Sequence, residues 1–163
     1  MISELELAWL AGFLDGEGHI GIRKRSLLSG SPRYSIILDV SHTKREAIEF
    51  LQNSMGGSTQ KRQGKKEWKT TYKWRVRGKK AQQILEKLSP FLKLKQEQAK
   101  LALELADGFK PFQHYHTVPR AELNRREQIY QRLRILNKTG QAGLQQGSQI
   151  KLLEELKRQA SLF

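Results

Sequence analysis

The chain has 163 residues, a formal net charge of +14 at pH 7 and no cysteine. This length fits one compact domain or one domain with a small appendage, and the lack of cysteine excludes disulfides, thiolate metal sites and cysteine catalysis. Because so large a positive charge favours attraction to a polyanion, nucleic acid is the leading expected partner. An anionic membrane surface is the second candidate, and a merely soluble basic protein is the third.

The N-terminal segment is acidic and apolar, without the basic region of a signal peptide. No apolar run approaches the ~20 residues that span a bilayer. The basic residues lie mostly in strand-like segments and not on an amphipathic helix, so a membrane partner is not expected. We therefore expect an intracellular protein of the cytoplasm or an organelle.

The first predicted element is a helix over residues 3–15. Ser3 and Glu6 have the capping-box spacing, and Gly16 and Gly18 are expected to end the helix. Apolar residues recur on one helical face, namely Leu7, Leu10, Ala11 and Leu14.

Two hairpins are predicted next, over residues 19–41 and 58–77, because apolar and polar side chains alternate there. Helices are predicted over residues 44–54, 79–88, 92–106, 120–137 and 148–160, with a linker over 139–147. This order predicts an α+β fold in which helices cover one side of a four-stranded antiparallel sheet. The expected core is helix–hairpin–helix–hairpin–helix over residues 1–108, and residues 109–163 form a helical extension packed on it.

The outer face of the predicted sheet is rich in cations and polar groups. Its candidate DNA-contacting residues are Arg23, Arg25, Arg33, Ser35, Asp39, Gln60, Arg62, Lys73, Arg75 and Arg77. A ribbon of strands can enter the major groove, where arginine pairs with guanine, and other cations bind phosphates. The alternative is an ordinary solvated face.

Small residues recur every four positions along the first helix, at Ala8, Gly12 and Gly16. Such a ridge lets a second helix approach closely. The same helix in a second copy could be that partner, since a two-fold interface is self-complementary.

Two acids, Asp15 and Glu17, stand at the end of this helix. Carboxylates are disfavoured at a helix C-terminus, so a compensating cation is indicated. Two copies crossing at the ridge would bring two Glu17 carboxylates together as a site for a hard divalent metal. The alternative is that both acids are solvated loop residues.

The segment LAGFLDGEG, residues 10–18, resembles the signature of LAGLIDADG homing endonucleases, in the form that homodimeric members carry once per chain. The order of elements up to residue 108 and the segment over residues 90–99 are also similar to that family. The resemblance implies an intron-encoded, site-specific endonuclease that cuts both strands of a long, near-palindromic DNA target. It also implies a homodimer and a divalent metal, Mg²⁺.

The resemblance implies roles for individual residues as well. Ala8, Gly12 and Gly16 would lie in the dimer interface. Glu17 would bind the catalytic metals, and the Gly16 carbonyl is an additional candidate ligand. Lys95 would offset charge at the scissile phosphate, His42 would organise water, and Arg45 would support the same pocket.

Three other functions fit the same residues. The chain could be a maturase that binds intron RNA, or a DNA-binding regulator of the same fold that does not cleave. It could also be a basic protein that coats nucleic acid with weak sequence preference and steep salt dependence.

Overall fold

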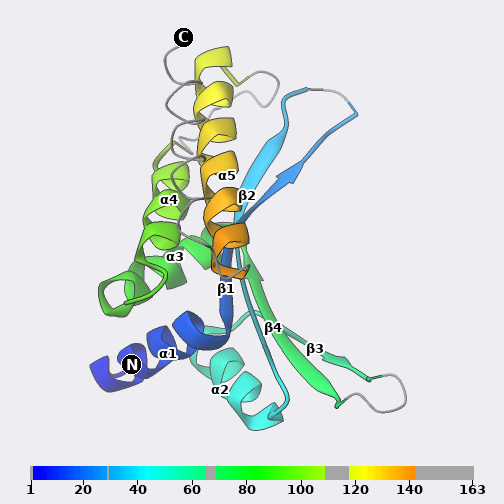
Figure 1. Ribbon diagram of the computed structural model, residues 1–163, viewed down its shortest axis with the longest axis vertical. Helices are drawn as coiled ribbons and strands as arrows, with labels where there is room; N and C mark the ends of the chain where they lie inside the picture. Colours follow the sequence, from blue (N-terminus) through cyan, green and yellow to red (C-terminus); the bar gives the residue numbers. More distant parts are fainter. Residues whose placement is uncertain (1, 29, 65–68, 109–117, 142–163) are drawn as a thin grey trace.

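The computed structural model describes residues 2–28, 30–64, 69–108 and 118–141, and it confirms the α+β fold (Figure 1). The helices gather on one side of a four-stranded sheet, and the two hairpins extend in opposite directions from it. In chain order the elements are α1 (Glu4–Glu17), β1 (Gly18–Arg25), β2 (Arg33–His42), α2 (Arg45–Met55), β3 (Ser58–Arg62), β4 (Thr71–Arg77), α3 (Gly78–Leu88), the 3-10 turn η1 (Ser89–Phe91), α4 (Gln96–Asp107) and α5 (Arg120–Gln141).

The strands lie in the order β1-β2-β4-β3, and every neighbouring pair is antiparallel. Residues directly opposite each other share a face of the sheet. His19 pairs with Asp39, Asp39 with Arg75, and Arg75 with Ser58. This register separates a polar face from the apolar face that the helices cover.

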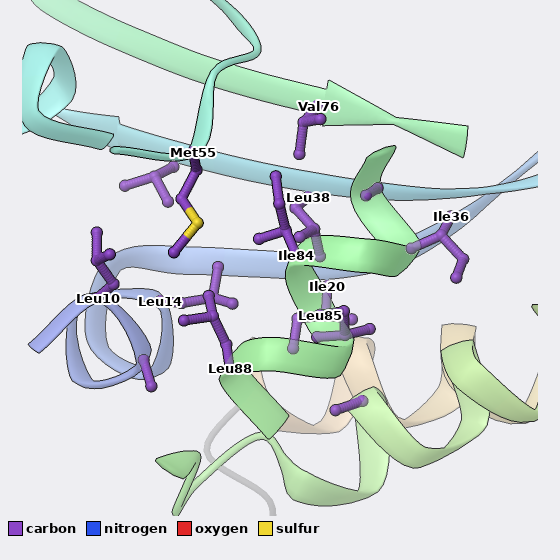
Figure 2. Close-up of a cluster of buried hydrophobic side chains, with 14 of the residues drawn as sticks. Leu10, Leu14, Ile20, Ile36, Leu38, Met55, Val76, Ile84, Leu85 and Leu88 are labelled. Atoms are coloured by element: carbon purple, nitrogen blue, oxygen red, sulfur yellow. The ribbon is translucent and has the colours of Figure 1, made fainter. Parts of the chain in front are cut away.

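The hydrophobic core lies between the apolar face and the helices (Figure 2). Leu10 and Leu14 of α1 and Leu85 of α3 pack there against Ile20 and Leu38 of the strands, and all five are at most 1% exposed. Such burial stabilises the fold by about 1.5–3 kcal/mol for each side chain. Within the described ranges, no helix is long and apolar enough to cross a lipid bilayer.

Helix α1 begins as predicted and ends later than predicted. Ser3 and Glu6 form the full capping box, in which each accepts from the backbone of the other. The prediction that Gly16 ends the helix was wrong, since α1 continues through Glu17. Gly18 is the C-cap, where the backbone becomes extended, and a side chain there would meet the carbonyl oxygen of Leu14 at 2.6 Å.

The predicted helix over residues 92–106 was wrong at its beginning. Helix α4 starts only at Gln96, and residues 92–95 form a bend. The backbone N–H groups of Lys93, Leu94 and Lys95 donate to the carboxylate of Asp15. A tertiary contact therefore overrides the helical pattern, and Leu94, an apolar residue of that predicted helix, is 76% exposed.

Helix α5 packs along α4 and β1. Ile129 and Leu133 are buried against Tyr34 and Leu105, and the Asn137 side chain donates to the carbonyl of Ile20 at 2.9 Å. The helix includes residues 139–141, which were predicted as linker, so that prediction was wrong there. The predicted helix over 148–160 lies outside the described residues. The division of the chain into a core over residues 1–108 and an extension over residues 109–163 stays a prediction.

Glu122 joins α5 to the end of α4 through two arginines. Its carboxylate accepts from Arg125 at 2.8 Å and from Arg126 at 2.7 Å. These arginines also donate to the carbonyls of Glu104 and Gly108. The hydrogen bond from Arg125, opposed by partial burial and helped by Arg126, lowers the pKa of Glu122 from 4.5 to about 2.

This shift predicts a pH-dependent contribution to stability. Because the folded-state pKa is depressed, the contribution is present above pH 4.5 and is lost as the pH falls toward 2. We expect Glu122→Gln to lower the free energy of unfolding at pH 7 by about 1–2 kcal/mol, a figure reduced for the carboxylate's partial exposure. Urea unfolding at pH 7 and pH 3 measures this. A difference between variant and wild type that does not narrow at pH 3 would contradict the assignment.

Candidate nucleic-acid interface and metal site

The polar face of the sheet carries all ten residues predicted to contact DNA. Strand alternation and register place them on one side, opposite the buried Leu38, Val40 and Trp74. They are Arg23, Arg25, Arg33, Ser35, Asp39, Gln60, Arg62, Lys73, Arg75 and Arg77. No helix covers this side in Figure 1. The face is therefore open to a ligand as large as a nucleic acid.

Some cations of this face are neutralised by an acid within the fold, and others are not. Asp39 forms ion pairs with Arg75 and, at 3.4 Å, with Lys73. Partial burial opposes ionisation of Asp39, but the hydrogen bond from Arg75 and the charge of Lys73 outweigh it, so the pKa of Asp39 lies below its usual value. The carboxylate of Asp39 is thus already paired with Arg75 and Lys73, which leaves it less able to accept a hydrogen bond from a DNA base.

The exposed arginines of this face are different. Within the described part of the chain, none of the following forms an ion pair: Arg23, Arg25, Arg33, Arg62 and Arg77. Unpaired guanidinium groups on one surface are suited to bind phosphates or the edges of guanines.

Helix α1 ends at the edge of this face, and strand β1 follows without a loop. Glu17 and Gly16 are exposed there. Asp15, by contrast, is 7% exposed, and its carboxylate accepts three backbone N–H groups at 2.6–3.1 Å. The two acids of the motif therefore differ in role, since Asp15 is occupied within the fold and Glu17 faces outward.

Lys95 lies beside these acids. Its ammonium donates a hydrogen bond to the backbone carbonyl of Asp15. Burial lowers the pKa of Lys95, while the carboxylates of Asp15 and Glu17 oppose that effect. The structure thus brings together Glu17, Gly16 and Lys95, which are close in the fold although 78 residues separate Glu17 from Lys95.

The donors at the end of α1 fit a hard divalent cation in part. Glu17 offers carboxylate oxygens, and the last carbonyls of a helix, including that of Gly16, lack intrahelical donors. Oxygen ligands of this kind suit Mg²⁺ or Ca²⁺, but these ions take about six or more ligands. The described residues contain no group of three or more metal-binding side chains. One chain would therefore supply only part of the ligand set, and a second copy, phosphate and water would have to complete it.

His42 and Arg45 lie apart from this group. The ring of His42 packs edge-on against Phe13 at 5.6 Å, and its Nδ1 accepts the backbone N–H of Lys44. Arg45 pairs with Glu49 at 2.7 Å on the surface of α2. Within the described residues, neither forms a hydrogen bond or ion pair with Glu17 or Lys95. Their predicted catalytic roles stay predictions.

His19 is a polar residue of this face for which the sequence suggested no role. It lies opposite Asp39, and a side chain at Gly21 would meet its Nε2 at 2.5 Å. Burial is the main cause that lowers the pKa of His19, and the nearby carboxylate of Asp39 opposes it. The sequence feature that could have indicated a role for His19 is its position two residues after Glu17.

The predicted interface ridge is open in the single chain. Ala8, Gly12 and Gly16 are exposed, and a side chain added at either glycine would meet nothing within 4 Å. Leu5 and Trp9 beside them are 84% and 49% exposed. An apolar helix face with room for close approach suits another helix.

Comparisons with known proteins agree with this geometry. The DNA endonuclease I-CvuI of Chlorella vulgaris is 37% identical over 108 residues, which are 63% of this chain and 64% of I-CvuI. The aligned part is thus a little under two thirds of that relative. A crystal structure of I-CvuI in complex with its target in the presence of calcium has a TM-score of 0.68, with 27% identity over 81% of this chain and 82% of the other.

Two further solved structures are similar. I-CvuI with uncleaved DNA in the presence of magnesium has a TM-score of 0.65, with 25% identity and 82% of each chain covered. The archaeal intron-encoded homing endonuclease I-Vdi141I, complexed with DNA, has a TM-score of 0.63, with 21% identity over 80% of this chain and 82% of the other, a likeness that shows the fold alone. The sequence profile of the LAGLIDADG endonuclease matches residues 10–107. The chain is therefore a member of the LAGLIDADG endonuclease family.

Proposed function

We propose that the chain is a site-specific DNA endonuclease that acts as a homodimer on a long, near-palindromic target, with Mg²⁺ as its divalent metal. One observation carries the proposal. The exposed carboxylate of Glu17 stands at the edge of the open cationic face, because β1 begins at the next residue. A duplex bound on the sheet would thus pass beside a candidate metal ligand. The complexes of I-CvuI with DNA, in the presence of calcium or magnesium, support the same assignment.

The exposed stripe on α1 supports the homodimer. A two-fold contact across Gly12 would cover Leu5 and the exposed half of Trp9. It would also bring the two copies of Glu17 toward one axis. The second copy would then supply metal ligands that one chain lacks. A dimer with two-fold symmetry matches a near-palindromic target, as in other dimeric DNA-binding proteins.

The proposed chemistry is phosphodiester hydrolysis. When bound, a divalent metal supplies an activated water and stabilises the leaving 3′ oxygen. Glu17 holds that site with its carboxylate, and the Lys95 ammonium offsets negative charge at the phosphate. The arginines of the sheet hold the duplex in register.

Selection from a library of double-stranded DNA tests the proposal. The protein is incubated with random duplexes and Mg²⁺, and sequencing identifies the fragments with new ends. We expect both strands of one near-palindromic motif to be cut, and no cut when EDTA replaces Mg²⁺. Analytical ultracentrifugation of the complex should show two protein chains per duplex.

Three results would contradict this function. A footprint on one DNA motif without cleavage in Mg²⁺ would indicate a regulator. Tighter binding to structured intron RNA than to any duplex would indicate a maturase. Binding with no preferred sequence and a steep loss of affinity with salt would indicate a protein that coats nucleic acid.

A further inference from the structure

We propose that Asp15 is a positioning residue that fixes Lys95 relative to Glu17, an inference that rests on the proposed function. The buried carboxylate of Asp15 joins the end of α1 to the bend before α4. Removing it would let Lys95 move without removing any group that touches DNA.

The contacts of Asp15 are numerous for one side chain. Oδ2 accepts the backbone N–H of Lys93 at 2.6 Å and that of Leu94 at 3.1 Å, and Oδ1 accepts the N–H of Lys95 at 3.0 Å. Hydrogen bonds from backbone N–H groups to a carboxylate are stronger than those between neutral groups. Asp15 therefore ties the bend before α4 to the end of α1, and one of the three N–H groups that it accepts is that of Lys95, the N-cap residue of α4.

The same residue also holds the Lys95 side chain. The ammonium donates to the backbone carbonyl of Asp15, so both ends of Lys95 are tied to one residue of α1. Glu17 lies two residues further along this helix. Its carboxylate and that of Asp15 both interact electrostatically with Lys95. The end of α1 therefore carries Glu17 and also holds the side chain of Lys95.

Among the described residues, the other contacts of the bend come from Leu92 and from α4. Leu92 is buried and its carbonyl accepts from the Gln96 side chain at 2.7 Å, which anchors the beginning of the bend. Leu94 is 76% exposed. The carbonyl of Lys95 accepts the backbone N–H of Ala99 at 2.9 Å, while its N–H and its ammonium are held by Asp15. The orientation of the Lys95 side chain toward α1 therefore depends on Asp15. Helix α1 also carries the exposed ridge of the proposed dimer interface. By binding Lys95 to α1, Asp15 would therefore fix the position of Lys95 relative to the proposed two-fold axis in each copy.

Four variants test the inference: Asp15→Asn, Lys95→Met, their double mutant, and Glu122→Gln as a control. The control removes a different partly buried acid, at the start of α5. The rate of a single turnover is measured with saturating protein on the selected duplex in Mg²⁺, and the Kd is measured in Ca²⁺. We expect Asp15→Asn to slow the single turnover about 10–100-fold, as with other groups that orient a ligand, with a Kd within about twofold of wild type.

The double mutant separates positioning from a general structural effect. If Asp15 acts through Lys95, then Asp15→Asn should change the rate less than about threefold in the Lys95→Met background. Rate losses that multiply in the double mutant would overturn the proposal. So would a folded Asp15→Asn protein that cuts at the wild-type rate, or a Glu122→Gln control that slows cleavage as much.

Hydrogen exchange gives a test that needs neither DNA nor metal. We expect the amides of Lys93, Leu94 and Lys95 to exchange at least about tenfold faster in Asp15→Asn than in wild type, and as in wild type in Glu122→Gln. Unchanged exchange in Asp15→Asn would overturn the inference even if the enzyme cuts DNA. A wild-type chain that cuts no duplex would instead overturn the proposed function, while faster exchange would still show the contact.

Discussion

Replacing Glu17 with glutamine should slow DNA cleavage at least about 1,000-fold, which corresponds to about 4 kcal/mol of lost transition-state stabilisation. The substitution keeps the size of the side chain and removes the negative charge that a divalent cation requires. Glu17 is exposed and its carboxylate accepts no hydrogen bond within the described residues, so the fold should be unaffected. Single-turnover cleavage of the selected duplex in Mg²⁺ measures the effect.

DNA binding separates this prediction from a loss of affinity. Removing a carboxylate beside the phosphates reduces repulsion, so the Kd of Glu17→Gln in EDTA should be equal to or lower than that of wild type. Glu86→Gln is a matched control, because it makes the same change on the exposed surface of α3. Cleavage by Glu17→Gln at the wild-type rate would show that another group holds the metal.

Replacing Gly12 with leucine should have opposite effects on the single chain and on the dimer. In the single chain, a side chain at Gly12 meets nothing within 4 Å, and leucine favours a helix by up to about 1 kcal/mol relative to glycine. In a dimer packed through the ridge, the same side chain would meet its own copy near the axis. We therefore expect a monomer of undiminished stability that has lost double-strand cleavage.

Sedimentation equilibrium and thermal unfolding together measure the two effects. Gly12→Ala should weaken the dimer less than Gly12→Leu, because its side chain is smaller. Gln128→Leu, which adds the same side chain to the exposed surface of α5, should leave the dimer unchanged. A Gly12→Leu protein that remains dimeric and cuts both strands would place the interface elsewhere.

The sequence was sufficient to predict most of the sheet, because strand alternation is a local property. Leu38 and Val40 are buried and Asp39 and Arg75 share the opposite face, as the pattern predicts. Arg62, which was predicted to lie on the outer face, lies opposite Thr71 on the polar face.

Features that depend on contacts between distant segments were not predicted. The sequence around Leu94 has helical periodicity, and only the tertiary contact with Asp15 shows that it forms a bend. The ion pairs of Asp39 depend on strand order, which a single sequence does not determine. The role of His42, which the resemblance implies, stays a prediction; strand alternation puts Ser41 on the polar face and His42 beside Phe13.

The separation of the two faces of β2 has a consequence for how such a protein can change its target. Substitutions at exposed strand positions usually alter stability by less than about 0.5 kcal/mol, so Arg33 and its neighbours can be exchanged without disturbing Leu38 beneath them. Asp39 is the exception, because a change there leaves Arg75 and Lys73 without a partner. If the sheet reads DNA as proposed, most of its exposed positions can change one at a time as the target changes, whereas Asp39, Arg75 and Lys73 are coupled by their ion pairs.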